Sequence, residues 1–225
     1  TGWYLNDCPN QLQNMKRIAA LAAILVIAGC TVRENDMERQ IDALYARMTP
    51  GERLAQLRAT YLNGFFDGGG NLDTARCRAL IPDGIGHFSQ YASQMSEEPG
   101  LIRDRVAAMQ DWLIHNTPNG IPALFHEEAL TGVCVRGATV YPQQIGLACS
   151  FNPELAQVKT WQTGTALRKM GGLLALSPMV DVVRNPSFNR LEESYGEDGY
   201  LTTAMGLAFV RGLQHDGNLR EGIGA

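Results

Sequence analysis

The chain has 225 residues, of which 45% are hydrophobic and 19% are charged. This composition is typical of one globular domain or part of one, and it is too short for two substantial domains. The formal net charge of −4 is not that of a basic, nucleic-acid-binding protein, and no Lys/Arg cluster falls on an expected helix face. Nucleic acid is therefore excluded as an expected partner.

The first thirty residues have the pattern of an export signal. Lys16 and Arg17 precede an apolar run at residues 18–27, and small residues lead to Cys30. The run is shorter than the roughly 20 residues that cross a bilayer, which disfavours a transmembrane anchor. Because it ends on Ile-Ala-Gly-Cys, residues 15–30 resemble a bacterial lipoprotein-type signal peptide, whose cysteine is lipidated.

We therefore expect residues 1–14 to lie upstream of the true start and residues 31–225 to form the mature part. The expected location is exported, either periplasmic or as an outer-membrane-anchored lipoprotein, with membrane contact only through a lipid on Cys30. The alternative is a short buried helix that happens to end in cysteine.

Helices and strands are expected to alternate after the leader. Apolar spacing predicts a helix over 35–48, and Thr49-Pro50-Gly51-Glu52 reads as a capping box that starts another. Residues 67–71 are expected to be a flexible loop. Further helices are expected at 101–114, from the Asn152 cap to about 170, and near 198–213, with buried strands at 121–125 and 173–177. This alternation favours parallel βα units, in an α/β barrel or a doubly wound sheet.

In a (β/α) barrel, functional side chains follow the carboxyl ends of strands. The segment after Phe125 carries His126, Glu127 and Glu128, and the segment after Ser177 carries further charged residues: Asp181, Arg184, Arg190, Glu192 and Glu193. Carboxylates and guanidinium groups suit the recognition of sugar hydroxyls. A zinc-protease motif would need a second histidine at position 130, which is Leu130, so no metal is expected.

Three ordered segments carry a family resemblance: GIPALFHEEALTG at 120–132, ATVYPQQIGLACSFNPEL at 138–155, and LSPMVDVVRNPSFNRLEESYGED at 176–198. Together they resemble family 3 glycoside hydrolases, over most of residues 36–225. The resemblance implies an α/β fold that is an incomplete TIM-like (β/α) barrel, truncated at the C-terminus. It implies no cofactor.

The resemblance assigns two substrate-binding residues. Glu128 matches the acidic residue that grips hydroxyls of the terminal sugar, and Arg190 matches the last arginine of the family's Arg-Asp-Pro-Arg-Trp-Gly-Arg segment, a sugar ligand. Arg184 matches the first arginine of that segment, which we interpret as loop scaffold. Where many members have aspartate, Glu128 is one methylene longer and crowds the place of a glucose hydroxymethyl group, so β-xylosidase stays open beside β-glucosidase. The alternative for Glu128 and Arg190 is a structural ion pair at the barrel mouth.

Some residues depart from the family pattern: Thr131 stands for a histidine, Ser187 for an arginine, Phe188 for a tryptophan and Asn189 for a glycine. Members of the family cleave terminal non-reducing β-linked sugars by a retaining mechanism that needs an aspartate nucleophile and a glutamic acid. In the family, the nucleophile lies in a Ser-Asp-Trp segment that follows a sugar-binding Lys-His pair. Neither segment occurs in these 225 residues, so no catalytic residue is expected in this chain.

Two functions remain open at this point. The first is the front part of an exported exo-β-glycosidase that acts on glucose or xylose at the end of an oligosaccharide or aryl β-glycoside, with this fragment inactive alone. The second is a non-catalytic saccharide-binding protein.

Overall fold

The computed structural model describes residues 36–95 and 97–225, and it divides into two compact units at Pro50. The first unit contributes a helix at residues 36–47. The expected leader at 15–30, with Cys30, and the expected upstream segment 1–14 lie outside the described residues. No helix in the described ranges is long and apolar enough to cross a membrane.

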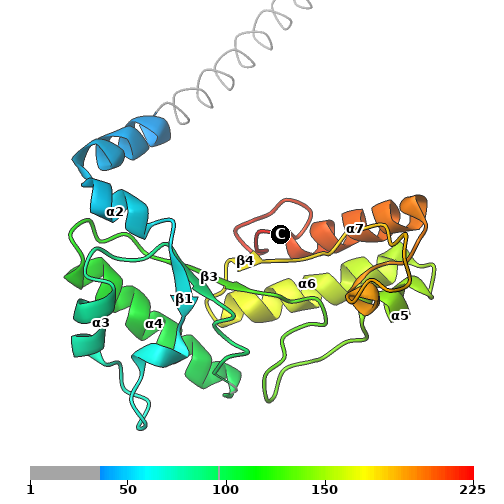
Figure 1. Ribbon diagram of the computed structural model, residues 1–225, viewed down its shortest axis with the longest axis horizontal. Coiled ribbons are helices and arrows are strands. Elements are labelled where there is room, and N and C mark those ends of the chain that lie inside the picture. Colours follow the sequence, from blue (N-terminus) through cyan, green and yellow to red (C-terminus); the bar gives the residue numbers. More distant parts are fainter. Residues whose placement is uncertain (1–35, 96) are drawn as a thin grey trace, which may run out of the picture. The chain divides into compact units, whose positions relative to one another are not determined.

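The second unit alternates strands and helices along the chain (Figure 1). Its elements are α2 (Pro50–Ala55), β1 (Ala59–Tyr61), the 3-10 helix η1 (Asn63–Phe65), α3 (Thr74–Leu80), β2 (His87–Ser89), α4 (Pro99–Asn116), β3 (Leu124–Glu127), α5 (Gln144–Ala148), α6 (Pro153–Lys169), β4 (Leu174–Ala175), the 3-10 helix η2 (Leu191–Glu193) and α7 (Gly199–Leu213).

The strands form one parallel sheet in the order β1-β2-β3-β4. Beside β4, the amide of Ala175 donates to the carbonyl of Gly224 at 2.9 Å, and Gly224 N donates to Leu173 O at 2.9 Å, so residue 224 forms a parallel bridge at that edge. Sequential parallel strands joined by helices are the topology of a (β/α) barrel. The expected α/β class and incomplete TIM-like barrel are confirmed.

Helix signals in the sequence agree closely with the structure. The Asn152 side chain accepts from the amides of Glu154 and Leu155 and caps α6, and the Asp198 side chain accepts from Leu201 N at 2.6 Å and caps α7. Figure 1 shows these two helices lying side by side. In α4 the buried positions are the ones predicted from apolar spacing: Ile102, Val106, Met109, Trp112 and Leu113.

Strand boundaries differ from the sequence prediction. The strand expected at 121–125 is Leu124–Glu127, since Pro122 has no amide hydrogen and ladder pairing begins only after it. The strand expected at 173–177 pairs as β4 only at Leu174–Ala175. Two strands, β1 and β2, were not predicted at all.

The loop expected to be a flexible connection is instead an organised turn. The Asp67 carboxylate accepts hydrogen bonds from the amides of Gly69 and Asn71 at 2.9 and 2.8 Å. These hydrogen bonds lower the pKa of Asp67 below its ordinary value, the bond from the Asn71 amide contributing most.

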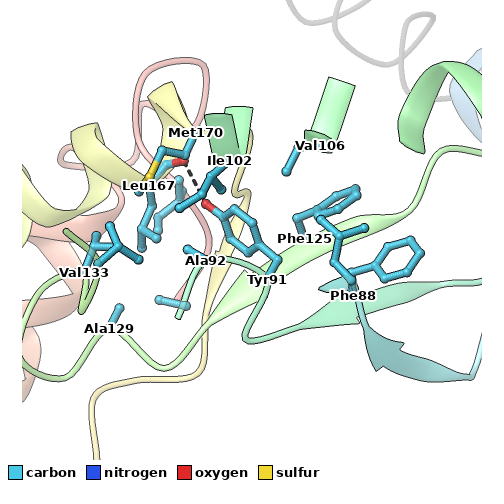
Figure 2. Close-up of a cluster of buried hydrophobic side chains, with 14 of the residues drawn as sticks. Phe88, Tyr91, Ala92, Ile102, Val106, Phe125, Ala129, Val133, Leu167 and Met170 are labelled. Carbon is cyan, nitrogen blue, oxygen red and sulfur yellow. Dashed lines mark hydrogen bonds between the residues drawn. The ribbon is translucent and has the colours of Figure 1, made fainter. Parts of the chain in front are cut away.

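Aromatic side chains join the sheet to the helices that cover it (Figure 2). Phe125 of β3 stacks on Phe88 of β2 with ring centroids 5.0 Å apart, and Tyr91 meets the Phe125 edge at 5.7 Å. The Tyr91 hydroxyl donates to the carbonyl of Leu167, near the end of α6, at 3.1 Å. Because side chains alternate along a strand, Leu124 points to the other face of the sheet, where it is 41% exposed.

This packing predicts the effect of truncating Phe125. The substitution Phe125→Ala is expected to lower the free energy of unfolding by about 3–5 kcal/mol, because it opens a cavity in a fully buried cluster. The matched control Leu124→Ala, on the same strand but the other face, should lower it by about 1 kcal/mol or less. Urea titration followed by circular dichroism measures both; equal losses would contradict this assignment of faces.

Candidate saccharide-binding site

The expected site residues lie at the carboxyl end of β3 and in the turn that follows it. His126 and Glu127 belong to the strand itself, which corrects the expectation that both lie in the loop after it. Glu128 is the first residue beyond the strand. Ala129, which follows it, has a φ of 61°, a backbone conformation that costs a residue with a Cβ about 1 kcal/mol or more. The chain therefore bends sharply next to Glu128.

The Glu127 carboxylate holds two strand ends together. It is 3% exposed and accepts four hydrogen bonds. Its Oε2 accepts from the amides of Ala92 and Ser93 at 3.2 and 3.0 Å, and its Oε1 accepts from the Ser93 hydroxyl and the Glu128 amide, both at 3.0 Å. A buried carboxylate is tolerated only when its oxygens are satisfied in this way. Glu127 is thus a structural residue that fixes the loop after β2 against the end of β3.

Glu128 is half-buried and faces solvent more than Glu127 does. Its Oε1 accepts from Gln90 Nε2 at 3.2 Å, and within residues 36–95 and 97–225 its Oε2 has no hydrogen-bond partner. A carboxylate with open acceptor positions can receive further hydroxyl donors.

A cavity of about 210 Å³ lies beside Glu128. Residues from the loop after β2, from the turn after β3, from the start of α5 and from η2 form its walls: Ser93, Glu127, Glu128, Ala129, Leu130, Thr131, Gly132, Cys134, Gln143 and Glu193. It is smaller than the roughly 300–1,000 Å³ typical of pockets for drug-sized ligands. Its size suits one small unit, and the carboxylates of Glu128 and Glu193 in its walls can accept hydrogen bonds from hydroxyls.

Arg190 lies next to this cavity without lining it. The exposed guanidinium donates to Glu193 Oε2 from Nε at 3.0 Å, and Nη2 contacts the same oxygen. The hydrogen bond and charge of Glu193 raise the pKa of Arg190, and the charges of Glu128 and Asp181 act in the same direction. Arg190 therefore pairs with Glu193 rather than Glu128, while Glu128 remains within its electrostatic reach.

Other charged residues named from the sequence play smaller parts. Arg184 and Glu192 are exposed and do not line the cavity. His126 is 7% exposed, and its ring lies 5.5 Å from that of His87. Burial, and next the charge of His87, lower the pKa of His126 below its ordinary 6.5, so it is neutral at pH 7.

Several residues at the cavity were missed by sequence reasoning. Gln90 and Ser93 follow β2, a strand of only three residues that was not predicted, so no loop was expected there. Gly132 closes the turn with a φ of 91°, and a Cβ at this position would lie 2.5 Å from the carbonyl oxygen of Thr139. The polar-apolar-polar alternation of His87, Phe88 and Ser89 was the available signal for β2, but three paired residues are too few to separate it from a loop.

The family model for the glycosyl hydrolase family 3 N terminal domain matches residues 53–222. The chain belongs to glycosyl hydrolase family 3. A relative from Formosa agariphila that bears a β-xylosidase name is 34% identical over 197 residues, which are 84% of this chain and 25% of that protein.

Solved structures agree with this assignment. A β-glucosidase from Erythrobacter marinus is 33% identical with a TM-score of 0.70, covering 78% of this chain and 23% of that one. A Listeria innocua β-glucosidase in complex with glucose is 26% identical with a TM-score of 0.66, covering 82% of this chain and 25% of that one. The chain thus spans about a quarter of the length of these relatives.

The geometry separates the roles of two adjacent glutamates. Glu127→Gln is expected to lower the free energy of unfolding by about 2–3 kcal/mol, because an amide group replaces one acceptor oxygen and faces backbone donors. Glu128→Gln, the matched control, should change it by less than about 1 kcal/mol. Thermal and urea unfolding measure the difference; equal stabilities of the two variants would contradict a structural role for Glu127.

Proposed function

We propose that this chain supplies the sugar-gripping part of an exo-β-glycosidase that releases terminal non-reducing xylose or glucose by a retaining mechanism. The observation that carries the proposal is the Glu128 carboxylate, which lines a small cavity at the carboxyl ends of parallel strands and has acceptor positions open. The names of the family relatives, β-xylosidase and β-glucosidase, support the substrate class.

In the proposed complex, Glu128 accepts hydrogen bonds from two hydroxyls of the terminal sugar. Arg190 donates to the same sugar, and Glu193 holds its guanidinium toward the cavity rim. Charge-assisted bonds of this kind are about twice as strong as neutral ones, which suits a ligand that presents only hydroxyls. The departures Ser187, Phe188 and Asn189 precede Arg190 in an exposed or half-buried loop, so they act on its position rather than on the cavity walls.

Xylose is the sugar we favour at this position. Glu128 reaches one methylene farther than the aspartate of many family members and occupies room that a hydroxymethyl group needs. A pentose lacks that group, so it fits beside Glu128 without displacing the carboxylate from Gln90.

We also propose that the protein is exported as a lipoprotein. The basic, apolar and cysteine-ended pattern of residues 15–30 supports this. The second candidate function, saccharide binding without cleavage, would use the same cavity beside Glu128.

The sugar site predicts a loss of affinity on neutralising Glu128. Glu128→Gln should weaken xylose binding at least tenfold, roughly the worth of one or two charge-assisted bonds. Isothermal titration with xylose and glucose measures this, and the parent chain should bind xylose more tightly. The matched control Glu192→Gln, at an exposed glutamate two residues beyond Arg190, should leave the affinity for xylose unchanged. If Glu128→Gln binds xylose as tightly as the parent chain, Glu128 is not a sugar-binding residue.

The proposed division of labour also predicts that the 225-residue chain by itself does not cleave glycosides, since the nucleophile and the acid of a retaining mechanism have no match in it. Release of nitrophenol from aryl β-xyloside and aryl β-glucoside should equal the buffer blank. Hydrolysis above the blank that persists after repeated purification would refute this.

A further inference from the structure

A buried lysine lies behind the turn that carries Glu128. Lys159, on α6, is 5% exposed, and its Nζ donates to the carbonyl oxygen of Leu130 at 2.6 Å. Leu130 is two residues beyond Glu128 and lines the same cavity. The hydrogen bond therefore connects a helix far along the chain to the wall of the proposed sugar site.

A second side chain completes the contact. Gln144, at the start of α5, is fully buried; its Nε2 donates to the same Leu130 oxygen at 2.7 Å, and its Oε1 accepts from Lys159 Nζ at 3.3 Å. Both lone pairs of the Leu130 carbonyl are thus used, and the carbonyl is held from two elements. This arrangement opposes rotation of the Leu130–Thr131 peptide, one residue beyond Ala129, which has the left-handed conformation.

No acidic side chain of the described residues balances this charge. The other groups near Nζ are the rings of Phe209 and Tyr141, with centroids 5.5 and 6.0 Å away. No ion pair with Lys159 is formed within residues 36–95 and 97–225, and burial alone lowers the pKa of Lys159 from 10.5 to about 8. Burying a cation without an ion-pair partner is costly. The shortest hydrogen bond that the ammonium group of Lys159 donates goes to the Leu130 carbonyl.

We propose that Lys159 is a positioning residue for the saccharide site: with Gln144 it clamps the Leu130 carbonyl and so holds the turn that presents Glu128. The sugar readout below rests on the proposed function, whereas the turn readout does not. The clamp is strongest when Lys159 is protonated, because an ammonium donates a stronger hydrogen bond than an amine.

The pH dependence has opposite signs for the site and for the fold. The lysine of the folded chain releases its proton near pH 8, while that of the unfolded chain keeps it until about 10.5. The unfolded chain therefore binds more protons between these values, and stability contributed by Lys159 rises with pH in that window. The clamp on Leu130 weakens over the same rise, starting near pH 8.

The turn can be followed without sugar by the Leu130 methyl signals in ¹³C–¹H NMR spectra. In the parent chain these signals should titrate with a midpoint near pH 8. They should be flat in Lys159→Met, which keeps the aliphatic stem and removes the charge, and should titrate normally in Lys169→Met, the matched control at an exposed lysine of the same helix. A flat titration in the parent chain, or one retained in Lys159→Met, would overturn the proposal.

Xylose titration supplies the functional readout. The parent chain should bind xylose about fivefold more weakly at pH 9.5 than at pH 6.5, roughly the difference between a charged and a neutral donor. Lys159→Met should bind with the weaker affinity at both values, although its melting temperature is unchanged or raised. If the xylose affinity of Lys159→Met falls only together with its melting temperature, Lys159 has a structural role alone, and the positioning role is overturned.

The two failures are distinguishable. A chain whose Leu130 signals titrate as expected but which binds no xylose at either pH supports the clamp and contradicts the saccharide site. If Lys159→Met does not fold, Lys159→Gln repeats the comparison, and the titration of the parent chain decides the proposal without any variant.

Discussion

The buried carboxylate of Glu127 is the interaction on which the site depends. Three of its four hydrogen bonds tie the loop after β2 to the end of β3, two segments 34 or more residues apart in sequence. These four bonds satisfy the oxygens of a carboxylate that would otherwise be costly to bury. They therefore restrict the conformation of the residues on either side. Gln90 and Glu128 lie on the two segments that Glu127 joins, and their side chains form a hydrogen bond with each other.

Apolar and polar contacts act on different parts of the same strands. On the helix-facing side, Phe88, Tyr91 and Phe125 fix the spacing of sheet and helices, and the Tyr91 hydroxyl reaches α6 (Figure 2). At the carboxyl ends, buried polar groups take over: Glu127 from within the sheet and Lys159 from α6. The turn between them has a backbone conformation that is unfavourable for alanine, and it persists because groups on both sides hold it.

The sequence predicted the long helices and the fold class, since capping residues such as Asn152 and Asp198 and the apolar spacing of α4 are local signals. It missed β1 and β2, which are three residues each and owe their pairing to neighbours distant in sequence. Glu128 was placed by family resemblance, and its partner Gln90 was not foreseen for the same reason as β2. The pairing of Arg190 with Glu193 is a local i,i+3 contact at η2, whereas the burial of Lys159 depends on packing between elements that no spacing rule encodes.

In the proposed function, the turn after β3 presents Glu128 to a terminal sugar. A crystal structure of the chain with xylose tests it most directly. We expect one sugar ring in the cavity between Ser93 and Glu193, with the Glu128 carboxylate accepting from its hydroxyls and the Leu130 carbonyl still bound by Lys159. A sugar bound elsewhere, with Glu128 left facing solvent, would contradict it.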